Sequence, residues 1–310
     1  MELLALGLVV AGLGRPLVQD LVDAPVLQTW STVFVSICVQ ALPFLVLGVL
    51  LSGALTAFVP PGALARALPR NPVASVPVAS AAGFLLPGCE CSSVPLSAGL
   101  MKDGVQTAPA LAFMLAAPAV NPIVLVSTAV AFPTLPEMVV SRLVASLIVA
   151  VVVGWAWARF GLPAWMRLRD RHHHEGATRT RVLLDSVRHD IAHAGGFLVI
   201  GGLTAATLNV LVPATFLDSV AGSGVAAVLT LSVLAVALAI CSEADAFVAA
   251  SLTQFSLTSR LAFLVVGPVV DVKLIALHVG TFGRGFALRF APLVFLVAVG
   301  AAVAVGGWLL

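Results

Sequence analysis

The sequence predicts an all-α integral membrane protein: a polytopic helical bundle of two homologous, inverted repeats with broken or re-entrant helices. Of its 310 residues, 60% are hydrophobic and only 10% are charged, whereas soluble domains contain about 25% charged residues. Several apolar runs are long enough to cross a bilayer, which takes roughly 20 residues per helix. An internal repeat in the sequence predicts that the bundle consists of two homologous units.

The repeat appears when the chain is compared with itself. Under a shift of 150 residues Cys91 falls on Cys241, Pro118 falls on Pro268, and Asn121 falls on Asp271. Under a shift of 153 residues the segment FLVLG at 44–48 falls on FLVIG at 197–201. The chain is therefore interpreted as a duplicated unit.

The repeat and the charges divide the chain into four parts. We expect an N-terminal helix at residues 1–29, transmembrane repeat 1 at 30–158, a cytoplasmic basic linker at 159–181 and transmembrane repeat 2 at 182–310. The linker carries six arginines, and the positive-inside rule places such a segment in the cytoplasm. The rule also favours inverted over parallel repeats, although both arrangements stay open, as does the question whether residues 1–14 span the membrane.

The most unusual stretch lies at residues 84–122, where thiols, a carboxylate, hydroxyls and prolines interrupt a strongly apolar chain. Pro87 and Gly88 break a helix just before two cysteines, and prolines on both sides of Asn121 break the next one. Membrane proteins use interrupted helices beside polar groups where the backbone lines a cavity. This stretch is the first candidate for a transport site.

Helix length predicts how the breaks are arranged. As straight helices, residues 72–102 and 223–255 would reach roughly 45 to 50 Å, against a hydrocarbon core of about 30 Å. We therefore expect two re-entrant hairpins with a cysteine at each tip, followed by interrupted crossings at 105–131 and 256–282. A twofold axis would bring the two tips together near the membrane midplane.

Thiols, hydroxyls and one amide at the breaks are the candidates for substrate binding. Thiolates select soft ions and thiophilic metalloids, while hydroxyl and amide groups can hydrogen-bond a substrate or satisfy free backbone groups. A buried cysteine can also be a small hydrophobe, which is the interpretation for Cys38. The substrate-binding candidates are Cys89, Cys91, Cys241, Ser92, Ser242 and Asn121.

Ionisable side chains at bilayer depth are the candidates for coupling to protons or cations, because such groups face a cavity or one another. They are Glu90, Glu243, Asp245, Asp271, Lys273 and His278. Asp271 and Lys273 could instead form a structural ion pair, although residues two apart on a helix do not face each other. His278, seven residues after Asp271, returns to nearly the same helix face, and a core histidine is its alternative role.

Several function classes are excluded or disfavoured. The chain has no GxxxxGK[ST] loop, so it is not an ATP-driven pump by itself, and its basic residues form no aromatic-interleaved face for nucleic acid. The CxC spacing differs from the CxxC of redox enzymes, so we expect no enzyme and no cofactor. The expected partners are the lipid bilayer and a small-molecule or ion substrate. Metal binding and the oligomeric state stay open.

The run GCECSSVPLSAGLMKDGVQTAPALAFMLAAPAVNP resembles the predicted-permease family that includes the organoarsenical efflux permeases of the ArsP and YraQ type. The resemblance covers most of residues 30–308 in hydropathy and spacing, with its specific motif at 87–122. It implies a multi-pass permease of a bacterial cytoplasmic membrane with a thiol-bearing site.

We therefore expect a secondary-type transporter. It would export a small thiophilic or organometalloid solute, such as a trivalent organoarsenical, through a cavity at the paired helix breaks. The alternatives are transport of a metal cation or a small anion and, in another class, a membrane thiol redox enzyme.

Overall fold

A computed structural model describes residues 25–58, 66, 68–69, 71–85, 90–166, 179–211 and 224–310. These residues form helices and contain no strand, which confirms the all-α class. Cys89 and most of the expected N-terminal helix and linker lie outside the described residues. The helices are α2 (Pro25–Phe58), α4 (Pro72–Ala82), α5 (Glu90–Lys102), α6 (Thr107–Val120), α7 (Pro122–Ala131), α8 (Pro136–Phe160), α9 (Arg179–Leu211), α11 (Gly224–Leu238), α12 (Asp245–Ser251), α13 (Leu257–Val266), α14 (Val272–Phe282) and α15 (Arg284–Leu309), with 3-10 turns at Gly83–Leu85 and Pro163–Trp165.

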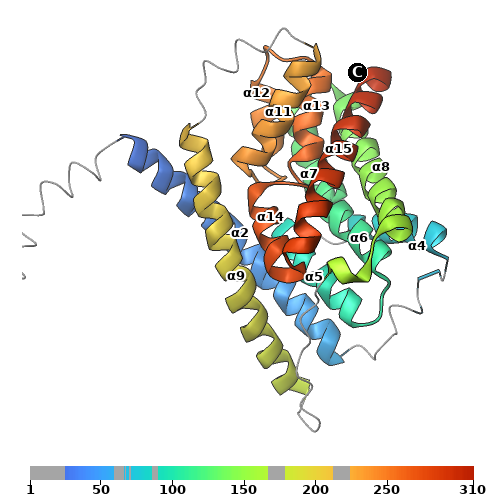
Figure 1. Cartoon of the computed structure of the whole chain (residues 1–310). Helices are drawn as coiled ribbons and strands as arrows, with labels where there is room; N and C mark the ends of the chain where they lie inside the picture. Colours follow the sequence, from blue (N-terminus) through green and yellow to red (C-terminus); the bar gives the residue numbers. More distant parts are fainter. Residues whose placement is uncertain are drawn as a thin grey trace, which may run out of the picture.

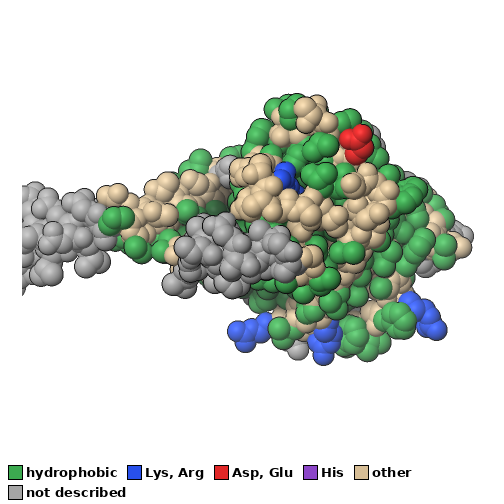
Figure 2. All heavy atoms as spheres, turned by 90° about the horizontal axis from the view of Figure 1, so that it is seen from above, with side chains coloured by type: hydrophobic (Ala, Val, Ile, Leu, Met, Phe, Trp, Pro, Cys, Tyr) green, Lys and Arg blue, Asp and Glu red, His purple; other side chains and the backbone are tan. Residues whose placement is uncertain are grey.

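Four helical segments in the described part of the chain are long and apolar enough to cross a membrane: Pro25–Leu51, Thr107–Ala131, Pro136–Phe160 and Arg284–Leu309. Five shorter apolar helices accompany them. Large apolar side chains remain exposed on the outer faces, such as Val39 and Leu296. Seen from above, hydrophobic side chains surround the middle of the molecule (Figure 2). A polytopic membrane protein has this distribution, because lipid covers its outer apolar faces.

Two helical hairpins turn back inside the bundle. In the first, α4 leads into the 3-10 turn Gly83–Leu85 and α5 returns from Glu90. In the second, α11 ends at Leu238 and α12 begins at Asp245. Between them Ala239 has a φ of 49°, a left-handed conformation that costs a non-glycine residue about 1 to 2 kcal/mol. The second tip is thus held in its shape by the packing around it.

Two further breaks interrupt the crossings that follow the hairpins. Asn121 separates α6 from α7, and its Oδ1 accepts a hydrogen bond of 3.0 Å from the backbone N–H of Val124. Asp271 precedes α14, and its Oδ1 accepts one of 2.7 Å from the N–H of Leu274. Both side chains are N-caps. The two residues that coincide in the sequence repeat therefore do the same structural task.

The helices that correspond in order within the two halves run in opposite directions (Figure 1). In that view α2 descends and the neighbouring α9 ascends, while α8 descends and α15 ascends. Inverted copies would have this arrangement. The helix bounds differ from the expected ones at two places: α2 begins at Pro25, before residue 30, and α9 begins at Arg179, inside the expected linker.

The centre of the bundle is formed by α6 and α13. Residues 108–120 of α6 and 261–266 of α13 are all buried. A helix that is apolar on every face needs neighbours on every face. α6 packs against helices of the first half, and α13 packs against helices of the second half and against α8 of the first. Their central position places the breaks at Asn121 and Asp271 deep inside the protein.

Candidate functional site

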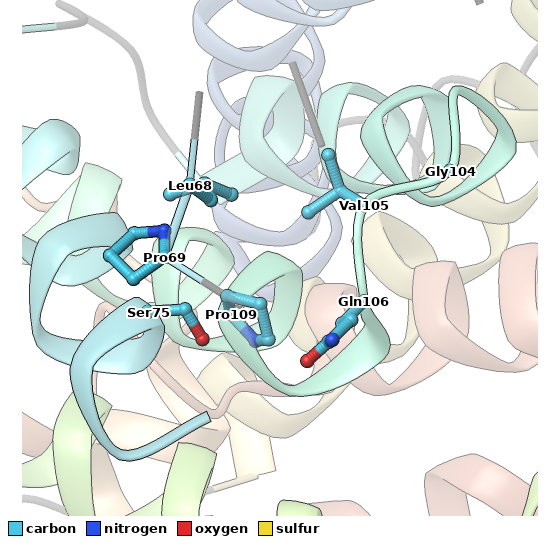
Figure 3. Close-up of a pocket in the computed structure, with 7 residues that line it drawn as sticks. All are labelled: Leu68, Pro69, Ser75, Gly104, Val105, Gln106 and Pro109. Atoms are coloured by element: carbon cyan, nitrogen blue, oxygen red, sulfur yellow. The ribbon is translucent and has the colours of Figure 1, made fainter. Parts of the chain in front are cut away.

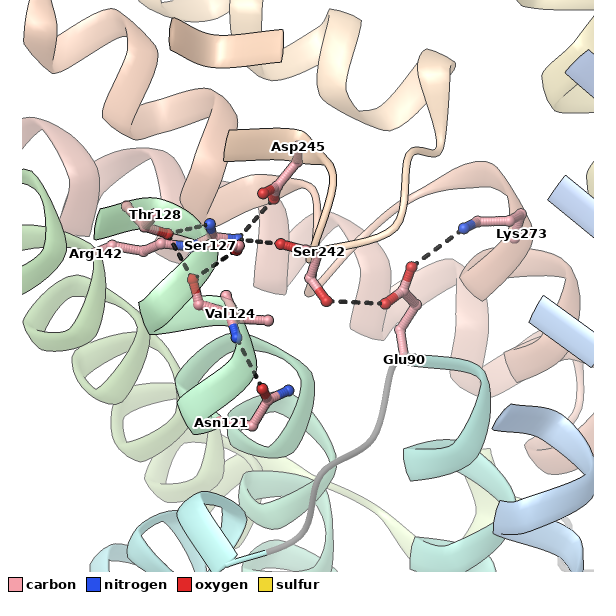
Figure 4. A network of polar contacts seen from close by, with 9 residues as sticks. All are labelled: Glu90, Asn121, Val124, Ser127, Thr128, Arg142, Ser242, Asp245 and Lys273. Atoms are coloured by element: carbon pink, nitrogen blue, oxygen red, sulfur yellow. Dashed lines mark hydrogen bonds and ion pairs between the residues drawn. The ribbon is translucent and has the colours of Figure 1, made fainter. Parts of the chain in front are cut away.

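Charged side chains gather where the breaks meet (Figure 4). Five of them are each at most 1% exposed: Glu90, Arg142, Asp245, Asp271 and Lys273. An unpaired charge at such depth is strongly unfavourable, so buried charges occur in pairs or beside a ligand. These five residues form the buried charge network, and its contacts show how the charges are balanced.

Glu90, at the tip of the first hairpin, receives contacts from the second half of the chain. Lys273 Nζ lies 3.1 Å from Glu90 Oε1 and 3.6 Å from Asp271 Oδ2. The hydroxyl of Ser242, at the tip of the second hairpin, donates to Glu90 Oε2 at 3.5 Å. The two tips therefore touch through Ser242 and Glu90, and Lys273 ties them to the break before α14.

The pairing of Asp271 with Lys273 corrects one argument from the sequence. Residues two apart on a helix do not face each other, but Asp271 lies outside the helix. Its backbone is extended, with φ of −143° and ψ of 173°, because it caps α14. From that position its second carboxylate oxygen can reach Lys273 in the first turn.

Arg142 is a member of the network that the sequence argument left out of the candidates. From α8 its Nη2 donates to Asp245 Oδ2 at 2.7 Å and to the carbonyl of Ser242 at 3.2 Å, and its Nη1 donates to Thr128 Oγ1 at 2.8 Å. The available signal was an arginine inside an otherwise apolar run. Arg142 holds the tip of the second hairpin against helices of the first half.

Each hairpin carboxylate is thus neutralised by a cation from the opposite half. Glu90 of the first half pairs with Lys273, and Asp245 of the second half pairs with Arg142. Both carboxylates stand in the first turn of the returning helix, where the helix dipole favours negative charge. The sequence repeat does not show this equivalence, because Glu90 and Asp245 do not coincide at the shift of 150 residues.

The contacts run without a gap from one interrupted crossing to the other. The Thr128 hydroxyl donates to the carbonyl of Val124 at 2.7 Å, and the N–H of Val124 donates to Asn121. From Thr128 the chain of contacts continues through Arg142, Ser242 and Glu90 to Lys273 (Figure 4). Its last step joins Lys273 to Asp271. All four breaks therefore share one polar network.

The network contains a surplus negative charge and polar atoms without hydrogen-bond partners among the described residues. When all groups are ionised, its three carboxylates exceed its two cations by one charge. Asp245 Oδ1 and Arg142 Nε have no hydrogen-bond partner within the described residues. Half-buried Glu243 adds a further carboxylate that interacts with Glu90, Arg142 and Lys273. A proton or a cation bound here would balance the surplus charge.

Two thiols lie beside these charges. Cys91 and Cys241 are free and buried, at 1% and 4% exposure. Cys91 follows Glu90 in the first turn of α5, and Cys241 precedes Ser242. Because Ser242 contacts Glu90, both thiols belong to the same region. Cys38, on α2, is only partly buried.

Two further residues that the sequence predicted for the site, Ser92 and His278, lie in different surroundings. Ser92 is buried in the first turn of α5, next to Cys91. His278 is buried, but its ring packs against Phe286 and Phe290, with ring centroids 5.7 and 5.6 Å away. Its two ring nitrogens have no hydrogen-bond partner among the described residues. The argument that placed it on a helix face with Asp271 was wrong in its premise, because Asp271 is not part of that helix.

A small surface pocket of about 80 Å³ lies at the base of the first hairpin (Figure 3). None of the candidate residues lines it. Its lining consists of Leu68, Pro69, Ser75, Gly104, Val105, Gln106 and Pro109. In the described part of the chain, no group of three or more His, Cys, Asp or Glu side chains is arranged to hold a metal ion.

Comparison with known proteins indicates that the chain is a transport protein. The family ArsP_1, described as "Predicted permease", matches residues 26–307. UPF0718 protein YcgR of Bacillus subtilis is 34% identical over 287 residues, which cover 89% of this chain and 97% of that protein. A putative two-component membrane permease complex subunit of Streptococcus mutans is 31% identical over 266 residues, or 83% and 88% of the two chains. No solved structure matches the chain. The chain therefore belongs to this predicted permease family of multi-pass membrane transporters.

Proposed function

We propose that this permease is a secondary-type transporter that exports a small thiophilic solute, such as a trivalent organoarsenical, across a bacterial cytoplasmic membrane. One observation carries the proposal: the tips of the two hairpins touch through Ser242 and Glu90, and each tip brings a buried free thiol next to buried charges. A solute bound at this place contacts both halves of the protein at once.

Cys91 and Cys241 supply the chemistry for recognising such a solute. Trivalent arsenic is a soft electrophile, and thiolates are its preferred ligands. When a thiol replaces a hydroxyl group on arsenic, an As–S bond forms, an As–O bond breaks, and the thiol proton leaves in the water that is released. The exchange is reversible and involves no change of oxidation state, as a transport site requires.

The buried charges supply a way to couple this step to protons. One surplus negative charge at bilayer depth is unfavourable, and a proton on Glu90 or Asp271 would neutralise it. Lys273 contacts both carboxylates and can favour either, so proton uptake from one side and release to the other need only a small movement. Glu243, Asp245 and His278 are the further coupling candidates.

The access change is proposed to follow from inverted repeats. The corresponding helices of the two halves run in opposite directions (Figure 1), and Asn121 and Asp271 cap equivalent breaks. In such a protein one half can rock against the other around a fixed site. Here the contacts that must open and close are those of Glu90 with Ser242 and Lys273.

The proposal can be tested with everted membrane vesicles, in which export appears as uptake. Vesicles containing the full chain should accumulate phenylarsine oxide, and an imposed pH gradient should change the rate. Cys91→Ser and Cys241→Ser should each abolish uptake, whereas Cys38→Ser, the matched control on α2, should not. Undiminished uptake in a variant lacking both Cys91 and Cys241 would refute the role of the thiols.

A metal cation is the second candidate, favoured by the surplus of buried carboxylates. The same vesicles should be offered Cd²⁺ and, as a representative small anion, arsenate. Uptake of Cd²⁺ without uptake of phenylarsine oxide would replace the proposed substrate class, and uptake of arsenate alone would favour an anion site. Membership of a permease family favours all three over a membrane thiol redox enzyme.

A further inference from the structure

The segment FLVIG, residues 197–201, stood out in the sequence repeat and has no role in the network itself. It lies on α9, which packs along α14, the helix that carries Lys273. Figure 1 shows the two helices next to each other. The contacts of the glycine and the phenylalanine of this segment indicate what it does.

Gly201 faces the backbone of Lys273. A Cβ atom at residue 201 would lie 2.7 Å from Lys273 Cα and 3.4 Å from the Lys273 carbonyl oxygen. The Cα cannot turn aside as a flexible side chain could, so any larger residue forces the two helices apart by about 0.7 Å to reach ordinary contact. Only glycine allows the close approach of α9 at this point.

A second contact fixes the other end of the same helix face. Gly280 lies seven residues after Lys273, which returns it to nearly the same face of α14. The ring of Phe197 fills the space where a Cβ of Gly280 would stand. Phe197 and Gly201 thus hold α14 against α9 at two points, and one of them is the backbone of Lys273 itself.

We infer that Gly201 is a positioning residue for Lys273: its close contact with the Lys273 backbone sets the reach of the ammonium group to Glu90 and Asp271. Those two contacts are 3.1 and 3.6 Å long. A displacement of about 0.7 Å is large enough to weaken the contact with Glu90 and to lengthen the contact with Asp271 beyond ion-pair range. The importance of this position for transport rests on the proposed coupling role of the network, whereas the contact with Lys273 does not.

The test compares three alanine substitutions in α9 of the full-length protein. Gly201→Ala meets the Lys273 backbone, Gly202→Ala meets only Phe34 and Ile37 of α2 at 3.5 Å, and Gly195→Ala meets nothing within 4 Å. All three raise helix propensity equally, so they differ in contacts alone. We expect Gly201→Ala to lower the thermal midpoint by at least about 2 °C, and the two controls to keep or raise it.

A double-mutant cycle separates positioning from simple packing. In a Lys273→Met background Gly201→Ala should lower the midpoint by less than it does in the wild type, because no ammonium remains to be displaced. An equal fall in both backgrounds would overturn the inference. If Lys273→Met does not accumulate, Glu90→Gln removes the partner of the same contact and serves as the second background.

Transport provides the functional readout. Gly201→Ala should change the pH dependence of phenylarsine oxide uptake, and Gly195→Ala should leave it unchanged; an unchanged pH profile in Gly201→Ala would refute the positioning role in coupling. If the wild type does not take up the probe, the proposed function fails, and the stability cycle alone then decides between positioning and packing.

Discussion

Replacing Asp271 by asparagine removes one negative charge from the buried network and keeps the helix cap. Asparagine caps a helix about as well as aspartate, and Asn121 does so at the equivalent break. Lys273 is not left unpaired, because Glu90 Oε1 remains 3.1 Å away. After the change two carboxylates face two cations, so the buried charges balance.

The expected loss of stability is therefore small, below about 1 kcal/mol, and far below the 3 to 5 kcal/mol of a stranded buried charge. Asp271→Ala removes the cap as well and should cost about 1 kcal/mol more. The effect on transport, in contrast, should be large. Without a group that titrates at this break, phenylarsine oxide uptake in Asp271→Asn should no longer respond to a pH gradient.

Thermal unfolding in detergent and vesicle uptake with and without a pH gradient measure the two effects. Glu137→Gln, at the exposed start of α8, is the control for a carboxylate-to-amide change. Two results would contradict the reasoning: uptake by Asp271→Asn with unchanged pH dependence, or a loss of stability as large as that of a stranded charge. The second would mean that Asp271 is the main partner of Lys273.

Three further predictions follow from the contacts. Arg142→Met should destabilise the protein by about 3 to 5 kcal/mol, because it strands Asp245, and adding Asp245→Asn should restore most of the loss in denaturation experiments; no recovery would mean that Arg142 acts mainly through Thr128 and Ser242. His278→Phe should keep or raise the thermal midpoint, since it removes two unpaired ring nitrogens from an aromatic cluster, and a changed pH profile of uptake would instead assign His278 to coupling. Inverted repeats predict that a cysteine replacing Arg284 is labelled only from the cytoplasm and one replacing Glu137 only from the opposite side, and labelling of Arg284→Cys from outside would favour parallel repeats.

Local features of this protein could be predicted from the sequence. Composition and apolar run lengths predict the all-α membrane class. The breaks were predicted close to where they occur, because prolines, asparagine and aspartate act on backbone hydrogen bonds within a few residues. Asn121 and Asp271 cap their helices for this reason. The position of Asp271 outside its helix was missed, and for that reason its pairing with Lys273 was kept only as an alternative.

The partners within the network were decided by the tertiary structure alone. Lys273 and Glu90 are 183 residues apart in the chain, and Arg142 and Asp245 are 103 apart. No local pattern determines which buried cation reaches which carboxylate. That choice depends on how the two halves pack and, within the second half, on a single glycine that lets α9 approach the backbone of Lys273. The residue types that can carry charge are written in the sequence, whereas the pairs that make these charges tolerable at bilayer depth exist only after the two halves have come together.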